Sequence, residues 1–362
     1  MSVELFRPLE PPLTPSRPLI VYNALPLNPR GGGVSTYIRE LLASMVATVD
    51  ADLVAAVHPA GSAELPTGVT PLVKRQSRGI RRALTGAVGF GPADLTHGLD
   101  VDLPLRRAGL MVSTVHDMAI FDVPWAFPKH RVLGEQVLVR SALRRADAII
   151  AVSSFTADRV QALVGRDPVV IHSAPGTEMT PPSDADIARV RAHYGLPERF
   201  VLHVGNIEPR KDLGTLAEAC RSASIPLVLT GHGLWASRAP GGVVEIGHVP
   251  LADLPPLYGA ATLVGYASRY EGFGLPPVEA MACGAPVVTT SVPAVAEVVG
   301  DGAETYLAGD VHGLARTLRE LVGDEHRRAE LAARGSERVR SLSWQQTAEA
   351  TAGVYRSLGL AV

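Results

Sequence analysis

Two glutamates, Glu271 and Glu279, stand eight residues apart in a segment whose composition suits ligand binding. The segment 270–288 reads YEGFGLPPVEAMACGAPVV; its adjacent prolines suit the first turn of a helix, which Gly284 would end. Carboxylates at this spacing would hold hydroxyl groups on opposite sides of a bound phosphate. A second interpretation makes Glu279 a first-turn partner of the helix dipole and Glu271 a solvated loop acid.

Anion-binding groups accompany these carboxylates. Main-chain N–H groups at Gly274 and Leu275 would precede the helix, where the helix dipole favours an anion. Earlier in the chain, the segment 204–212 reads VGNIEPRKD and places Arg210 and Lys211 after an expected strand. Two adjacent cations in a loop at the end of a strand suit an anionic ligand. The alternative is that both are solvated residues at the start of a helix.

The first half of the chain adds three candidates. The run Gly31–Gly33 precedes a helical pattern and indicates either a phosphate-binding loop or a flexible turn. His116 and Asp117 follow an expected strand, at its carboxyl end. Ser153 ends another expected strand, and Ser154 is expected to cap the following helix.

As a whole, the segment 270–288 resembles the nucleotide-sugar-binding signature of family 4 glycosyltransferases, which are retaining enzymes of the GT-B fold. VGNIEPRKD is similar to the family's basic loop, and the glycine run to its glycine-rich loop before the first helix. ADAIIAVSSFTADRV and the terminal SWQQTAEAT resemble further family segments, so the resemblance extends from about Gly31 to Thr351.

The resemblance implies a role for each matched residue. Glu279 would bind the ribose diol and Glu271 the hydroxyls of the donor sugar. Arg210 and Lys211 would stabilise the leaving diphosphate, and His116 would contact the donor sugar near its reacting carbon. The full set implied for donor binding is Gly32, Gly33, Gly205, Asn206, Gly272, Phe273, Gly274, Leu275 and Glu279; Asp117 and Ser153 are implied on the acceptor side. The family often has arginine where this chain has Asn206.

Other motifs carry weaker signals. GHGLWA at 231–236 fits a dinucleotide-binding fingerprint, but the acidic residue expected about 20 positions later is missing. Asp-x-Asp pairs at 100/102 and 184/186 fit caps and turns better than a metal site. The basic stretch KRQSRGIRR, Lys74–Arg82, is a solvated face, a lipid-headgroup contact or a grip on a phosphorylated acceptor. No metal and no cofactor beyond the donor is expected.

Composition excludes several classes of protein. The 362 residues are 46% hydrophobic and 19% charged with a net charge of −2, which predicts a globular protein and argues against a nucleic-acid binder. Two cysteines form no disulfide framework, and neither a signal peptide nor a membrane-spanning run is evident. We therefore expect a cytoplasmic protein, with peripheral contact to the inner face of the membrane left open.

The order of expected elements predicts two Rossmann-like domains. Short β-rich runs alternate with helical stretches, the first helix starting near Val34. Ten strands are expected. Their ranges are 19–22, 52–57, 93–96, 111–115, 148–152, 200–204, 226–230, 243–246, 261–266 and 286–290. We predict an acceptor-side domain at 1–173, completed by a terminal helix at 342–362, and a donor domain at 174–341, facing each other across a cleft.

These expectations define a function. The protein would move a hexose from a nucleotide diphosphate sugar to an acceptor hydroxyl with retention. The EPRK form of the basic loop is most similar to users of GDP-mannose, so mannose is favoured. The acceptor, a sugar, lipid-linked or small molecule, is not identified by the sequence, nor is the oligomeric state. The alternatives are a UDP- or dTDP-sugar transferase, a nucleotide-sugar epimerase on the same fold, and a noncatalytic nucleotide-sugar-binding subunit of a glycan assembly complex.

Overall fold

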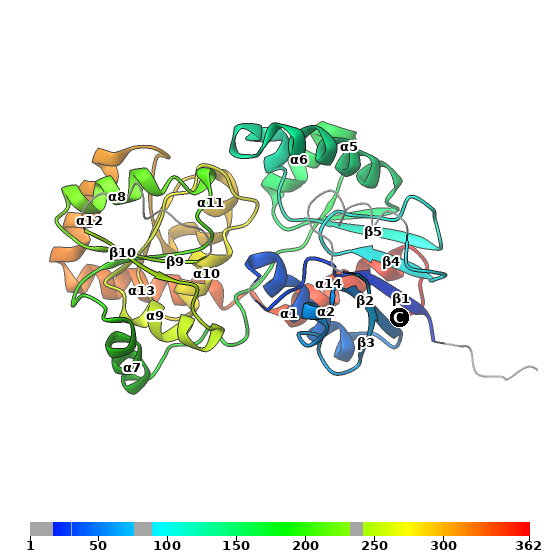
Figure 1. Ribbon diagram of the computed structural model, residues 1–362, viewed down its shortest axis with the longest axis horizontal. Helices are drawn as coiled ribbons and strands as arrows, with labels where there is room; N and C mark the ends of the chain where they lie inside the picture. Colours follow the sequence, from blue (N-terminus) through cyan, green and yellow to red (C-terminus); the bar gives the residue numbers. More distant parts are fainter. Residues whose placement is uncertain (1–16, 30, 76–88, 232–241) are drawn as a thin grey trace, which may run out of the picture.

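Two parallel β-sheets, one in each half of the chain, form the cores of two lobes (Figure 1). The computed structural model describes residues 17–29, 31–75, 89–231 and 242–362. The first sheet has the strand order β3-β2-β1-β4-β5-β6-β7 and the second has the order β10-β9-β8-β11-β12-β13. In each sheet the order reverses once beside the first strand of its half, which is where a doubly wound sheet leaves a crevice for ligands. The predicted pair of Rossmann-like domains is confirmed.

The strands agree with the sequence pattern at most positions. In the first sheet they are β1 (Leu19–Asn23), β2 (Asp52–Val57), β3 (Val69–Val73), β4 (Leu95–Gly98), β5 (Leu110–Val115), β6 (Ala148–Ala151) and β7 (Val169–Val170). In the second they are β8 (Val201–Val204), β9 (Leu227–Thr230), β10 (Val243–Gly247), β11 (Leu263–Tyr266), β12 (Val287–Thr290) and β13 (Glu304–Tyr306). All expected strands are present within two residues at each end, whereas β3, β7 and β13 were not predicted.

Helices cover both faces of each sheet. The first lobe has α1 (Gly33–Thr48), α2 (Pro59–Ser62), α4 (Ala119–Asp122), η1 (Pro124–Ala126), α5 (Lys129–Arg145) and α6 (Ser154–Val164). The second has α7 (Asp184–Tyr194), η2 (Pro209–Lys211), α8 (Leu213–Ser222), η3 (Leu251–Asp253), α9 (Leu254–Ala260), α10 (Leu275–Ala282), α11 (Pro293–Val299), η4 (Gly300–Gly302), α12 (Val311–Gly323) and α13 (Glu325–Val339). α7 follows the connection between the two sheets.

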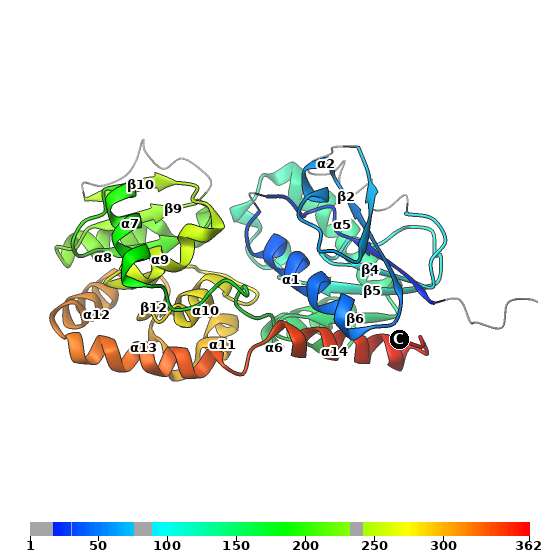
Figure 2. The ribbon, with the colours of Figure 1, turned by 90° about the horizontal axis from the view of Figure 1, so that it is seen from below.

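The last helix, α14 (Trp344–Ser357), returns to the first lobe. Figure 2 shows α13 along the base of one lobe and α14 along the base of the other. α14 packs against α1, and the ring N–H of Trp344 donates to the carbonyl of Pro175 at 2.9 Å. Deeper in the lobe, the hydroxyl of Tyr355 lies 2.6 Å from Nδ1 of the buried His97. The chain therefore crosses between the lobes twice.

Among the residues that the structure describes, apolar side chains form three clusters that hold these layers together. The largest includes residues of both lobes, among them Tyr37 of α1, Phe200 before β8 and Tyr355 of α14. A second lies between the second sheet and α8 and α12, and a third between β5, β6, α5 and α6. In the part of the chain that the structure describes, no helix has both the length and the apolar character needed to cross a bilayer.

Candidate active site

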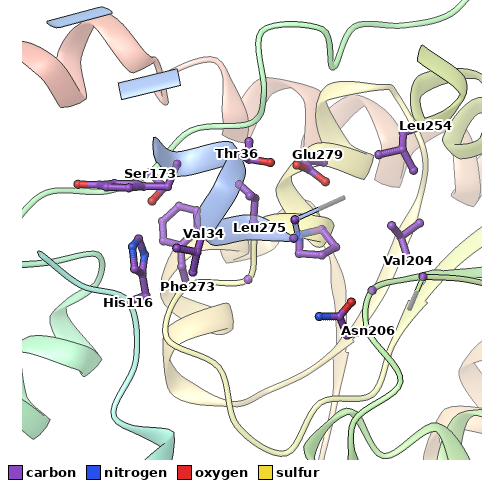
Figure 3. Close-up of a pocket in the computed structure, with 18 of the residues that line it drawn as sticks. Val34, Thr36, His116, Ser173, Val204, Asn206, Leu254, Phe273, Leu275 and Glu279 are labelled. Atoms are coloured by element: carbon purple, nitrogen blue, oxygen red, sulfur yellow. The ribbon is translucent and has the colours of Figure 1, made fainter. Parts of the chain in front are cut away.

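A cavity of about 490 Å³ opens between the lobes and is lined by residues of both. Figure 3 shows Thr36 and His116 of the first lobe facing Asn206, Phe273 and Glu279 of the second. The structure brings every predicted site residue to this cavity except Ser153. Those that line it are Gly32, Gly33, His116, Asp117, Gly205, Asn206, Arg210, Lys211, Glu271, Gly272, Phe273, Gly274, Leu275 and Glu279.

Arg210 and Lys211 meet on a single carboxylate. Nζ of Lys211 lies 2.6 Å from Oε1 of Glu271 and 2.6 Å from the hydroxyl of Tyr266. Nη1 of Arg210 donates to Oε2 of Glu271 at 3.0 Å, while its Nε donates to Glu208 at 3.0 Å. Both oxygens of Glu271 are thus hydrogen-bonded within the protein. The interpretation of Glu271 as a solvated loop acid is wrong.

The local fold explains how these residues meet. Arg210 and Lys211 end the short η2 helix after β8, and Asp212 turns the chain into α8 with φ of 45°. The loop after β11 carries Glu271. Because β8 and β11 are neighbours at the point where the strand order reverses, their following loops flank the same crevice. A backbone hydrogen bond of 2.8 Å from Arg269 to Arg210 joins the two loops.

Burial and charge together set the ionisation of this cluster. Burial alone would raise the pKa of Glu271, but Lys211 and Arg210 lower it to about 2. Burial lowers the pKa of Lys211, although the adjacent Glu271 opposes the shift. For Arg210, burial is outweighed by Glu271 and Asp117, which raise its pKa. Glu271 pairs with both cations and Glu208 pairs with Arg210 as well, so these ion pairs hold the two cations in the cavity wall.

Gly272 allows the lobes to approach closely. A Cβ at this position would overlap the backbone carbonyl of His116 in the opposite lobe. Two residues later, Gly274 has φ of 103°, in the left-handed region, and leads directly into α10. Leu275 at the start of α10 would touch a Cβ added to Gly33 in the first lobe. The two glycine-rich loops therefore face each other across the cavity.

Glu279 lies at another part of the cavity wall. It is 7% exposed, and its Oε2 accepts from the hydroxyl of Tyr258 at 3.3 Å. Burial raises the pKa of Glu279 to about 7. α10 begins at Leu275, so Glu279 belongs to its second turn, and the interpretation as a first-turn dipole partner is wrong. A buried carboxylate in a cavity suits recognition of hydroxyl groups.

His116 and Asp117 line the first-lobe side, directly after β5. Nε2 of His116 lies 2.8 Å from the carbonyl of Leu99, and because a carbonyl only accepts, Nε2 carries a proton. The His116 ring also packs edge-on against Tyr37, with centroids 4.6 Å apart. Asp117 accepts from the N–H of Ala119, and burial raises its pKa. These contacts hold the loop after β5 in place on the first-lobe side of the cavity.

Ser153 links the lobes from outside the cavity lining. It is the N-cap of α6, where it accepts from the N–H of Thr156; the predicted capping by Ser154 is wrong by one residue. Its hydroxyl donates to the carbonyl of Gly272 at 2.6 Å. Its acceptor-side role stays a prediction.

Further contacts between the lobes had no signal in the sequence. The hydroxyl of Tyr270 donates to Asp122 at 2.8 Å. Glu297 of α11 accepts from the N–H groups of Ser154 and Phe155 at 2.8 and 3.2 Å, at the start of α6. These partners lie more than 140 positions apart in the chain, so local patterns do not reveal them.

The weaker motifs contribute little to this site. Asp184 and Asp186 lie in the first turn of α7, capped by Ser183. Within the described ranges, no group of three or more His, Cys, Asp and Glu is placed to hold a metal ion. Most of the GHGLWA motif and of the Lys74–Arg82 stretch lies outside the described residues.

Known proteins are similar to this chain in the segments that carry the site. The family described as "Glycosyl transferases group 1" matches residues 198–324, which include Arg210, Lys211, Glu271 and Glu279. The O-antigen chain mannosyltransferase B of Escherichia coli is 33% identical over 282 residues, covering 72% of this chain and 74% of that protein. The chain belongs to the group 1 glycosyltransferase family.

A second relative of this glycosyltransferase is the D-inositol 3-phosphate glycosyltransferase of Rhodococcus jostii RHA1. It is 30% identical over 300 residues, which cover 75% of this chain and 64% of that protein.

Solved structures agree on the fold. Sucrose-phosphate synthase from Thermosynechococcus elongatus superposes with a TM-score of 0.74 at 20% identity, covering 96% of this chain and all of that one. HepE from Anabaena, solved with UDP and glucose, gives a TM-score of 0.72 at 20% identity, covering 94% and 100%. The group 1 glycosyltransferase described here is therefore an enzyme with the GT-B arrangement of two lobes.

Proposed function

We propose that this glycosyltransferase transfers mannose from GDP-mannose to an acceptor hydroxyl with retention of anomeric configuration. The observation that carries the proposal is the pair of cations, Arg210 and Lys211, fixed by Glu271 in the wall of the interdomain cavity. The E. coli mannosyltransferase relative supports mannose as the sugar.

The cation pair would receive the diphosphate of the donor. Its negative charge increases as the bond between the anomeric carbon and the phosphate oxygen breaks, so cations positioned beforehand stabilise the transition state. The N–H group of Leu275, at the N-terminus of α10, would add to this stabilisation. The acceptor oxygen forms its bond to the anomeric carbon on the face that the phosphate leaves. The departing phosphate oxygen takes the acceptor proton.

The other lining residues complete the donor site in this proposal. Glu279 would accept hydrogen bonds from the ribose diol. His116 would contact the sugar near the anomeric carbon, with Nε2 already committed to Leu99. Glu271 accepts from Lys211 and Tyr266 at Oε1 and from Arg210 at Oε2, so its predicted contact with the sugar hydroxyls would be made by the remaining lone pair of Oε2. The close lobes would exclude water that otherwise hydrolyses the donor.

A UDP-sugar is the second candidate donor, because HepE was solved with UDP and glucose. The same cations would bind the diphosphate of a GDP-sugar or of a UDP-sugar. The preference for base and sugar is therefore measured by donor binding, separately from transfer. In a thermal-shift panel of GDP-, UDP-, dTDP- and ADP-sugars, a donor at 100 times its dissociation constant stabilises the fold by about 2.7 kcal/mol.

Transfer is then measured by mass spectrometry with the best donor, a panel of alkyl glycosides and water as acceptors. We expect a hexosyl product from GDP-mannose. It should be abolished by Lys211→Ala and retained by the matched control Arg221→Ala, at an exposed position of α8. Interconversion of the donor without transfer would instead indicate an epimerase. Donor binding without turnover would indicate the noncatalytic subunit.

A further inference from the structure

One side of α5 combines large apolar and cationic side chains in solvent. Leu133 is 71% exposed and Val137 is 62% exposed. Lys129, Arg140 and Arg144 are exposed as well. Positions 129, 133, 137, 140 and 144 follow the three- and four-residue steps of a helix, so they form one continuous stripe. We call these five residues the α5 stripe.

Two more large apolar side chains are exposed near the ends of the helix. Before it lies Trp125, which is 59% exposed, and beyond its other end lies Leu105, which is 57% exposed. Leu105 and Arg144 line a surface hollow of about 460 Å³ with three further arginines. These are Arg107, Arg145 and Arg166. The hollow has one carboxylate in its lining, Asp147, which pairs with Arg107 at 2.6 Å.

The charge of this surface differs from that of the chain. Residues 124–145 carry five cations and one carboxylate, whereas the whole protein has a net charge of −2. The carboxylate, Glu135, pairs with Arg131 at 2.7 Å and stands off the stripe. Within the part of the chain that the structure describes, no carboxylate pairs with Lys129, Arg140 or Arg144. Apolar side chains among such cations complement a surface of anionic headgroups over an apolar interior.

The opposite side of α5 packs on its own lobe, so the stripe is not the helix's packing face. Ala142 and Leu143 are buried against Met111 of β5 and Ile149 of β6. Figure 1 shows α5 and α6 together on one side of the lobe, away from α14. Asp122, three residues before Trp125, contacts Tyr270 of the donor loop. One end of the surface therefore lies beside the rim of the cavity.

We propose that the α5 stripe, with Trp125 and Leu105, binds the surface of an anionic lipid bilayer. Leu133, Val137 and Trp125 enter the headgroup layer while Lys129 and Arg144 contact lipid phosphates. Bound in this way, the enzyme presents its cavity close to the bilayer, where a lipid-linked acceptor resides. Placing the acceptor there rests on the proposed function, but the binding itself does not.

Vesicle flotation without donor tests the surface directly. The wild type is compared on vesicles of equal phosphatidylglycerol and phosphatidylcholine and on pure phosphatidylcholine. We expect binding to the anionic vesicles that weakens with salt. Lys129→Gln/Arg144→Gln should lower the partition coefficient about 30-fold, from about fivefold per cation. Leu133→Ser/Val137→Ser should lower it roughly tenfold or more.

Matched controls lie on the second lobe. Leu307→Ser removes a side chain that is 72% exposed, and Arg316→Gln an exposed cation of α12; both should bind as the wild type does. Trp125→Ser, outside the helix, repeats the test if an α5 variant loses thermal stability. The proposal is overturned if the wild type does not bind anionic vesicles. It is equally overturned if the stripe variants and Trp125→Ser all bind these vesicles as strongly as the wild type does. It is also overturned if only Lys74→Gln/Arg75→Gln, in the other basic stretch, abolishes binding, or if binding needs a second protein.

Discussion

Nζ of Lys211 lies 2.6 Å from Oε1 of Glu271, although the two residues are 60 positions apart in the chain. The second oxygen of the same carboxylate holds Arg210 at 3.0 Å. Glu271 thus fixes two cations in the cavity wall before any ligand arrives. Such preorganisation is what an electrostatic catalyst of diphosphate departure requires, because no reorganisation is needed during the reaction.

Replacing the shared carboxylate should affect stability and transfer together. In Glu271→Gln, two buried cations lose their common counter-charge, and we expect a loss of about 3–5 kcal/mol in the free energy of unfolding. Transfer should fall about 100-fold or more as the cations move. Urea unfolding and kcat/KM measure the two effects. Glu208→Gln, at a carboxylate on the more exposed side of Arg210, is the control and should lose far less in both. Wild-type transfer in Glu271→Gln would contradict the positioning role.

Glu279 should make stability fall as pH rises. Burial raises its pKa to about 7, against 4.5 for the ordinary group. Between these values the folded state binds the additional proton, so the free energy of unfolding decreases with increasing pH. The contribution is roughly 3 kcal/mol from pH 4.5 to 7. Glu271 acts in the opposite direction and below pH 4.5, since its pKa is lowered.

The difference between the wild type and Glu279→Gln isolates the Glu279 contribution. Denaturant titrations from pH 4.5 to 8 should show the variant gaining stability relative to the wild type as pH rises. Parallel curves for the two proteins would mean that Glu279 has an ordinary pKa. Glu279→Ala should also weaken nucleoside diphosphate binding by about 1–3 kcal/mol, measured by calorimetry.

A side chain at Gly272 should force the lobes apart. The added methyl group of Gly272→Ala would overlap the backbone carbonyl of His116, and backbone yields less readily than a side chain. We expect transfer to fall at least tenfold. Gly214→Ala on α8 is the matched control, since a Cβ there meets nothing within 4 Å. Small-angle scattering should report a larger radius of gyration for Gly272→Ala only. An active Gly272→Ala enzyme of unchanged size would show that close approach is dispensable.

Transfer should persist after dialysis against EDTA. Two cationic side chains face the proposed diphosphate position, and they supply the charge that a divalent metal provides in other sites. Activity is followed before dialysis, after it and after adding Mg²⁺ or Mn²⁺. A requirement for metal would contradict this prediction and make the Asp-x-Asp pairs at 100/102 and 184/186 candidate metal ligands.

Sequence patterns predicted the strands that are central in each sheet and missed three at the edges. β3, β7 and β13 each end a sheet, and their side chains are mostly exposed or half-buried. β3 also contains Pro71. An edge strand needs no continuous apolar run and tolerates proline, so it lacks the signal that identifies buried strands.

The candidate site was predictable where glycines and charges sit in short motifs, and not where distant residues meet. The motifs identified Arg210, Lys211 and Glu279. They could not indicate that Glu271 would bind the two cations, because that contact depends on β8 and β11 being neighbours. Tyr266, which donates to Glu271 at 2.9 Å, appeared only as the last residue of a strand.

The most direct measurement compares the calorimetric affinities of the wild type and Lys211→Met. Each protein is titrated with a nucleoside diphosphate and with the matching monophosphate, using the pairs GDP/GMP and UDP/UMP. If Lys211 binds the diphosphate, the substitution should weaken the preferred diphosphate about 30-fold, or roughly 2 kcal/mol, and leave its monophosphate nearly unchanged. Equal weakening of both ligands, or no measurable binding of either diphosphate to the wild type, would contradict a diphosphate-linked donor held by these cations.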